Sequence, residues 1–375
     1  MFAHFTHHVS NSLLTPLLPV IRDSLSLSYT HSGFLVSAFT VSQGFSQAPI
    51  GMLADRFTSR TVIILGLFAT ALCMALVGLA GEYWQLLLVL ICMGVVAGSY
   101  HAPAATALAQ AFRKESLGGA LGLHTMGGNF SFFATPLVAG GLVAITQTWR
   151  SPYLAFALAP ALAALLLLAI TPQHTDEAAG TRRQGVGILR DLLGVFRVVG
   201  PLLTAVILFQ LVYAAMSSLL ALYLVDVRGF APATAVFIVA IPSMGSLIGG
   251  PLGGALSDRL GRRPVILISL GCLGPLLWLL VVVPEFAMFP VLLLMGLFAS
   301  MRMPVVEGLL LDRAPVDRRA TILGSYYLVA QELGGLGAPA LGGLATLFGI
   351  SAAFTAVGIT AALFSALILL VRARL

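Results

Sequence analysis

Long runs of apolar residues, separated by short clusters of charged residues or by glycine and proline, fill almost the whole chain. Each run reaches the roughly 20 residues that a helix needs to cross the hydrocarbon core of a membrane. Because a helix satisfies its backbone hydrogen bonds within one segment, the pattern predicts an all-α integral membrane protein. About twelve spans are expected, at residues 2–21, 30–54, 61–80, 85–111, 119–145, 151–171, 198–225, 232–257, 264–283, 286–311, 320–347 and 350–371.

One longer polar connection divides the expected spans into two sets of six. It covers residues 172–197, between a first half at residues 1–171 and a second half at residues 198–375. The later part of this connection places apolar side chains on one helical face and arginines elsewhere, which is typical of a helix lying in the membrane interface. We therefore expect two six-helix halves joined by a cytoplasmic linker that contains a short interfacial helix.

The two halves repeat each other in sequence. The pattern G-x-x-x-D-R-x-x-x-R occurs at Gly51, Asp55, Arg56 and Arg60, and again 203 residues later at Gly254, Asp258, Arg259 and Arg263. Many secondary transporters consist of duplicated halves, which alternately open a site near the membrane midplane to either side. The repeat predicts a pseudo-symmetric bundle with a cavity between its halves.

The distribution of basic residues predicts the orientation. With both termini in the cytoplasm, 16 of the 20 lysine and arginine residues lie inside and only Arg22, Arg150 and Arg228 lie outside. Such an excess of positive charge marks cytoplasmic loops, here of a multi-pass protein in the cell inner membrane. Charged residues make up 9% of the chain and hydrophobic residues 59%, which excludes a large soluble domain and therefore a soluble enzyme or a nucleic-acid-binding protein.

The paired turn motifs, together with the absence of charged and amide side chains from every third span, resemble the major facilitator superfamily over the whole chain. Residues 4–22, Tyr100-His101-x-Pro103 and Gly127-Gly128-Asn129-Phe130 are similar to its fosmidomycin-resistance-type branch, whose members are taken to be proton-driven exporters. The resemblance implies a major facilitator fold with twelve transmembrane helices and transport by proton antiport.

The resemblance also implies a cytoplasmic gate at the two repeated turns. In that gate, Asp55 and Asp258 would act with the arginines Arg56, Arg60, Arg259, Arg262 and Arg263. The sequence leaves open that the two aspartates merely cap helices and that the arginines only set the topology. Leu90 stands where the family has an arginine, so a coupling scheme that uses that arginine does not carry over.

Polar side chains within the spans of the first half are candidates for binding substrate or protons. His4, His8 and Asn11 share one helical face, and histidine titrates near neutral pH. Solvated histidines near the headgroups, or hydrogen bonds that join the fourth and fifth spans, are the alternatives. The further candidates are Gln43, Tyr100, His101, His124 and Asn129.

Residues His4-x-x-His7-His8 have the spacing of a histidine box in metal-dependent membrane enzymes. Such enzymes need several boxes, however, and the remaining histidines are scattered singly along the sequence. We therefore expect no metal site and no cofactor.

In the second half, Arg302, Glu307 and Glu332 are charged residues inside expected spans. A buried guanidinium needs a counter-ion, for which Glu332 is the first choice and Glu307 the second. A desolvated carboxyl group can hold a proton near neutral pH and exchange it, which is the chemistry of proton coupling. A static ion pair is the alternative. Gln210 and Tyr213 are further candidates for the cavity.

These observations predict a secondary transporter that moves a small organic molecule by alternating access, with proton-coupled efflux of a drug or metabolite as the first hypothesis. Proton-coupled uptake of a small organic anion is the alternative, and a non-transporting membrane receptor is a third. The chain has no G-x-x-x-x-G-K-[ST] motif that would indicate drive by ATP. The expected partners are a small-molecule substrate, protons and the lipid bilayer, with no nucleic acid and a monomer favoured.

Overall fold

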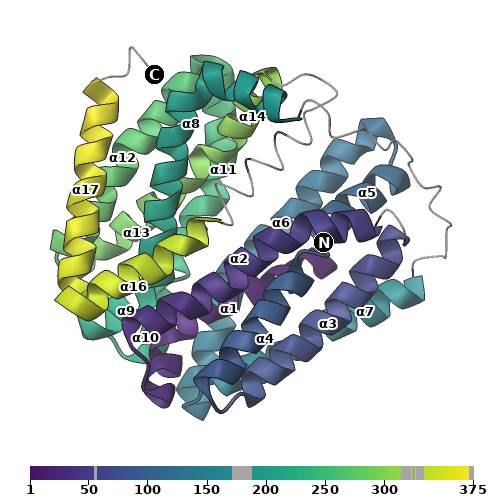
Figure 1. Cartoon of the computed structure of the whole chain (residues 1–375), viewed down its shortest axis with the longest axis horizontal. Helices are drawn as coiled ribbons and strands as arrows, with labels where there is room; N and C mark the ends of the chain where they lie inside the picture. The colour runs from purple at the N-terminus through teal and green to yellow at the C-terminus, as the bar shows by residue number, and fades with distance from the viewer. Residues whose placement is uncertain (55–56, 171–187, 314–321, 323–325, 327–332, 371–375) are drawn as a thin grey trace. The chain divides into compact units, whose positions relative to one another are not determined.

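The computed structural model describes residues 1–54, 57–170, 188–313, 322, 326 and 333–370 (Figure 1). Within these ranges the ordered elements are helices and no strand occurs. Nine helical stretches of the described chain are long and apolar enough to cross a membrane. The predicted all-α class is therefore confirmed, while the first part of the eleventh expected span lies outside the described residues.

The helices group into two compact units. The first unit comprises residues 1–182 and 231–237, and the second comprises residues 183–230 and 238–375. Apart from the segment 231–237, this division falls inside the expected linker, most of which lies outside the described residues. The first unit contains α1 (Phe2–Leu25), α2 (Tyr29–Ala54), α3 (Ser59–Leu79), α4 (Tyr83–Ala97), α5 (His101–Ala111), α6 (Lys114–Thr146), α7 (Arg150–Ile170) and most of α10 (Pro232–Ile238).

The second unit contains most of the helices of the second half. Residues 188–197, expected as a separate interfacial helix, instead form the first turns of α8. At 31 residues, α8 is roughly 46 Å long, more than the hydrocarbon core of about 30 Å, so it extends beyond that core. The unit contains α8 (Ile188–Ser218), α9 (Leu220–Asp226), α11 (Ile241–Leu260), α12 (Arg262–Val282), α13 (Glu285–Met301), α14 (Met303–Arg313), η3 (Leu333–Leu336), α16 (Gly337–Phe348) and α17 (Ile350–Leu370).

Glycines bring corresponding helix pairs into close contact in both units. A methyl group at Gly94 of α4 would overlap the side chain of Ser42 on α2, and one at the equivalent Gly296 of α13 would overlap the backbone of Pro242 on α11. In the second unit, Gly245 and further glycines of α11 lie directly against the backbone of α13 as well. Since no hydrophobic force drives helices together in lipid, such small residues provide the close packing that holds these crossings.

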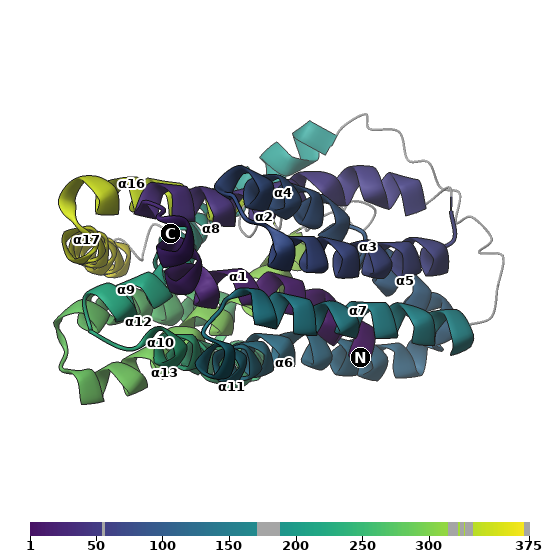
Figure 2. The ribbon, with the colours of Figure 1, turned by 90° about the horizontal axis from the view of Figure 1, so that it is seen from below.

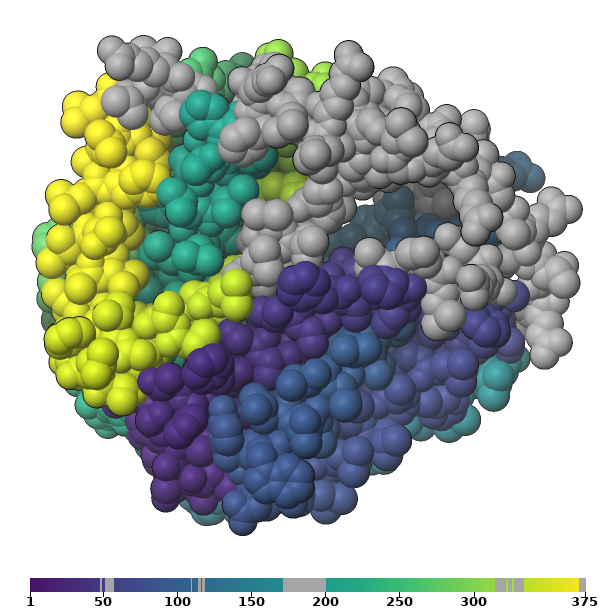
Figure 3. All heavy atoms as spheres, in the orientation of Figure 1, coloured from purple at the N-terminus to yellow at the C-terminus, as the bar shows by residue number. Residues whose placement is uncertain are grey.

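The helices that contain every third expected span pair with each other within each unit. In the first unit α3 packs along α7, as Figure 2 shows, and in the second α12 packs along α17. Their outward faces carry exposed leucines such as Leu158 and Leu363. On the inner side, Phe209 of α8 stacks on Phe364 of α17, and the two helices meet without a gap in Figure 3. These exposed apolar faces fit contact with lipid.

Two expected spans are each broken into two helices at matching places. The fourth span divides into α4 and α5 at residues 98–100, and the tenth divides into α13 and α14 at Arg302. Pro103 and Pro304 follow these breaks, and proline cannot donate the backbone hydrogen bond that would continue a helix through the preceding turn. The repeat therefore places Tyr100 and Arg302, which correspond in sequence, at the same kind of interruption.

Arginines expected on the outer side close the ends of helices. Arg150 donates a hydrogen bond to the carbonyl oxygen of Ala80, which follows α3, at 2.9 Å. Arg228 donates to three carbonyl groups at the end of α12, those of Leu280, Val281 and Val283. The last carbonyl groups of a helix have no partner within it, so these arginines serve as caps.

The glycine crossing in the second unit gives a test with a matched control. Replacement Gly245→Ala puts a methyl group against the backbone of Leu293, whereas Gly250→Ala, on the same helix, meets nothing within 4 Å. We expect Gly245→Ala to lower the free energy of unfolding by about 1–3 kcal/mol because α11 and α13 must separate. Gly250→Ala should leave stability unchanged or raise it by up to about 1 kcal/mol. Thermal unfolding in detergent measures both, and equal melting temperatures for the two variants would contradict the packing described.

Candidate functional site

Histidines from three helices of the first unit gather beside the break between α4 and α5. We call His4, His7, His8, His101 and His124 the histidine group. The first three lie on α1, His101 begins α5, and His124 lies on α6. The ring of His4 stacks on that of His124, with centroids 4.1 Å apart, and the ring of Tyr100 lies nearly parallel to both, 5.4 Å from His4 and 5.9 Å from His124.

One hydrogen bond orients the ring of His4 and leaves its other nitrogen without a partner among the described residues. Nδ1 of His4 lies 2.7 Å from the carbonyl oxygen of His124. A carbonyl oxygen only accepts, so Nδ1 donates and the lone pair of the neutral ring is on Nε2. This Nε2 is buried and has no hydrogen-bond partner among the described residues, and the same holds for Nε2 of His7. The side-chain amide of Asn11 donates to Nδ1 of His8 at 3.2 Å.

Two local features of the sequence make room for this group. Gly128 lets α6 approach α1, because a methyl group there would lie 2.6 Å from Cε1 of His4 and 2.8 Å from Cδ2 of His8. The break before Pro103 turns the chain so that His101 reaches α1. A cleft of about 490 Å³ opens next to the group, lined by Met1, Leu108, Phe112, Ser116, Gly119, Ala120, Leu123 and His124.

Not every candidate of the first half joins the group. Asn129 is exposed on α6, and Gln43 is buried on α2. The histidines that looked scattered in the sequence are largely brought together by the fold, because α1, α5 and α6 meet at this point. His31 lies apart on α2, where it is exposed and packs on Tyr83, and His174 lies outside the described residues.

A second polar group surrounds Arg302 in the other unit. Arg302 is 1% exposed at the break between α13 and α14 and donates a hydrogen bond to Oε1 of Gln210 on α8. Tyr213, also on α8, and Tyr326 lie close enough to interact electrostatically with the guanidinium. Nε of Arg302 is buried without a hydrogen-bond partner in the described part of the chain. A guanidinium held in this way can bind an anionic or carbonyl group.

Two glutamates are expected to pair with Arg302, and the structure describes one of them. Glu307 lies on α14 and interacts electrostatically with Tyr326, whereas Glu332 lies outside the described residues. No pattern in the sequence indicated Tyr326 as a candidate site residue. It is a tyrosine in an apolar stretch, and only the fold brings it next to Arg302.

The residues assigned to a gate show one pairing that the sequence did not predict. Arg262, at the start of α12, forms a two-bonded ion pair with Asp312, with Nε 2.6 Å from Oδ2 and Nη2 3.1 Å from Oδ1. The resemblance had implied Asp258 as its partner, but Asp258 is exposed on the last turn of α11. Asp312 lies on another helix, 50 residues from Arg262, so no local spacing could have revealed it.

The other gate residues are placed separately. Arg60, on α3, donates to the carbonyl oxygen of Leu168 near the end of α7 at 2.9 Å. Arg259 and Arg263 are exposed on either side of the turn between α11 and α12. Asp55 and Arg56 lie outside the described residues. A gate at the two repeated turns therefore stays a prediction.

Comparison with known proteins gives consistent similarity over the whole chain. The chain is 26% identical over 362 residues to the multidrug resistance protein MdtG of Citrobacter koseri, covering 92% of this chain and 86% of that protein. It is 24% identical to the fosmidomycin resistance protein of Escherichia coli K12, covering 91% and 84%. The crystal structure of a bacterial homolog of the human lysosomal transporter Spinster matches the fold with a TM-score of 0.80 at 17% identity, covering 97% and 94%.

The sequence also matches the profile of the Major Facilitator Superfamily at residues 1–248 and 228–374, which together include nearly every residue. That family consists of transporters, not enzymes, which agrees with the duplicated turns and the duplicated helix breaks. The chain therefore belongs to the Major Facilitator Superfamily and is a multi-pass integral membrane protein that transports a small molecule by secondary transport.

Proposed function

We propose that this transporter exports a small organic compound in exchange for protons, with Arg302 and Glu332 at the coupling site. The observation that carries the proposal is the complete burial of Arg302 at a helix break beside Gln210, Tyr213 and Tyr326. A charge inside a transmembrane bundle is costly, and it is normally kept where substrates or ions pass. The resistance named for the two relatives supports export as the direction.

Exchange of substrate for protons follows if the side chain of Glu332 binds either a proton or the substrate, but not both at once. In this scheme the carboxyl group carries a proton taken up on the outer side, or its carboxylate binds a hydrogen-bond donor of the substrate on the cytoplasmic side. Arg302 stabilises the carboxylate when neither is bound. Since proton and substrate exclude each other, each outward step of the substrate requires an inward step of a proton.

A second candidate function is uptake of a small organic anion together with protons. The specific observation in its favour is Nε of Arg302, which has no hydrogen-bond partner among the described residues and could bind a carboxylate or phosphonate. An anion on Arg302 and a proton on Glu332 favour each other, because protonation removes the carboxylate that competes for the guanidinium. The same pair of residues then couples the two movements in one direction.

Substrate-induced proton flux in proteoliposomes that contain a pH-sensitive dye distinguishes these functions. The panel comprises amphipathic drugs, phosphonates and organic acids. We expect at least one compound to move against the proton flux, and Glu332→Gln to abolish this flux while substrate exchange continues, since the amide cannot carry the proton. Proton and compound moving together would establish uptake instead, and an unchanged flux in Glu332→Gln would refute this coupling site.

We further propose that both termini lie in the cytoplasm of a bacterial cell, with the protein in the inner membrane. The bias of basic residues supports this orientation, and the exceptions Arg150 and Arg228 cap helix ends, which accounts for their presence on the outer side.

Cysteine labelling in intact cells tests the orientation. In a chain whose Cys73, Cys92 and Cys272 are replaced by alanine, Glu82→Cys and Ser116→Cys introduce single thiols at exposed positions before α4 and at the start of α6. A membrane-impermeant maleimide should label position 82 directly and position 116 only after permeabilisation. The reverse order would invert the proposed topology.

A further inference from the structure

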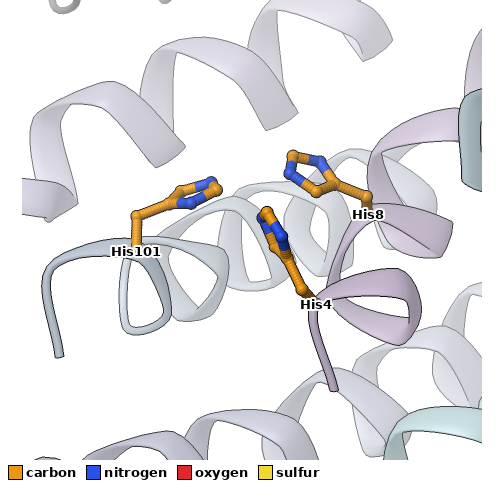
Figure 4. Close-up of side chains that lie close together, drawn as sticks. All are labelled: His4, His8 and His101. Atoms are coloured by element: carbon orange, nitrogen blue, oxygen red, sulfur yellow. The ribbon is translucent and has the colours of Figure 1, made fainter. Parts of the chain in front are cut away.

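The histidine group is a partly buried cluster of titratable side chains that the proposed coupling site does not use. His4, His8 and His101 each offer one ring nitrogen, and these three nitrogens lie within 4.8 Å of one another. Figure 4 shows the rings of His4 and His8, from α1, and of His101, from α5, pointing toward one another. We propose that these three histidines bind a divalent transition-metal ion of the zinc class.

The donor set fits such an ion. Neutral imidazole is a preferred ligand of Zn²⁺, and three histidines with an open fourth position form a known type of zinc site. His4 and His8 are four residues apart on one helix, which places them on the same face, as in helical zinc motifs with two histidines at this spacing. Tetrahedral coordination needs nitrogens roughly 3.4 Å apart, so small rotations of the three rings would close the site.

A hydrogen bond from the ring of His4 orients it for binding a metal ion. Histidines that bind metals almost always donate their second ring nitrogen to a carbonyl or carboxylate group, which fixes the tautomer and the ring orientation. Nδ1 of His4 donates in this way to the carbonyl oxygen of His124 at 2.7 Å. The buried Nε2, which has no hydrogen-bond partner among the described residues, therefore keeps a lone pair that is free to bind the ion. A buried polar atom without a partner is unfavourable, and a metal ion bound there would supply the missing partner.

His8 can be prepared in the same way by Asn11. The amide nitrogen of Asn11 lies 3.2 Å from Nδ1 of His8, while its Oδ1 is buried without a hydrogen-bond partner in the described chain. A half-turn of the amide would place Oδ1 on Nδ1–H of His8 and free Nε2 of His8 for the ion. The cleft beside the group, whose lining includes His124, gives a path by which an ion could enter.

Zinc titration of the purified full-length protein tests this inference. The protein is produced without a polyhistidine tag, stripped with a chelator and titrated with Zn²⁺ by calorimetry in detergent. We expect one ion per chain, and His8→Ala and His101→Ala should each weaken the affinity at least about tenfold because one of three ligands is lost. His31→Ala is the matched control, since this exposed histidine on α2 lies outside the group, and it should bind as the wild type does.

Two further measurements separate loss of a ligand from loss of the fold. Melting temperatures of the metal-free variants must match that of the wild type, and His101→Gln replaces His101→Ala if the latter unfolds. X-ray absorption at the zinc edge should show nitrogen ligands at about 2.0–2.1 Å. No saturable binding to the wild type, or unchanged binding in a folded His101 variant, would overturn the inference. Zinc binding by the histidine group does not depend on proton coupling. This inference would therefore stand even if the proposed export were refuted.

Discussion

A polar group inside a membrane-spanning bundle must find its partner within the protein, because hydrocarbon offers none. This constraint accounts for much of the structure. Hydroxyl side chains such as Thr70 and Ser131 return hydrogen bonds to carbonyl groups of their own helices. Arg150 and Arg228 close the open ends of α3 and α12. The glycine crossings then bring helices close enough for packing to replace the hydrophobic force that is missing in lipid.

Half of the eight buried side-chain nitrogen and oxygen atoms that the described residues leave without a hydrogen-bond partner belong to the histidine group, to Asn11 beside it, or to Arg302. They include Nε2 of His4 and of His7 in the first unit and Nε of Arg302 in the second. Both groups lie at breaks that correspond in the internal repeat, one before Pro103 and one before Pro304. The duplicated scaffold has thus acquired imidazoles in one copy and a guanidinium in the other, which are suited to different ligands. A cluster of neutral imidazoles fits a metal ion, and a buried guanidinium fits an acidic or carbonyl group.

Most of the helices and their duplication could be predicted from the sequence, because a helix depends on residues that are close together along the chain. The hydrophobic runs predicted the helices, and the repeated G-x-x-x-D-R turns indicated the duplication and the family. The helix breaks at residues 98–100 and at Arg302 were seen only in the structure, although a proline follows each of them. Contacts between distant segments could not be predicted at all. The partnership of Arg262 with Asp312 and the meeting of His101 with His4 depend on how helices pack, which no spacing along the chain encodes.

We infer that Arg302 belongs to the transport site and does not only join helices. Substrate exchange at equal concentrations across proteoliposomes, which needs no proton gradient, tests it most directly with a compound that the wild type transports. We expect Arg302→Gln to abolish exchange, and Arg302→Lys, which keeps the charge but loses the planar fork, to retain only a part of it. Glu285→Gln, exposed at the first turn of α13, should exchange normally. Exchange at the wild-type rate in a folded Arg302→Gln protein would show that Arg302 does not belong to the transport site.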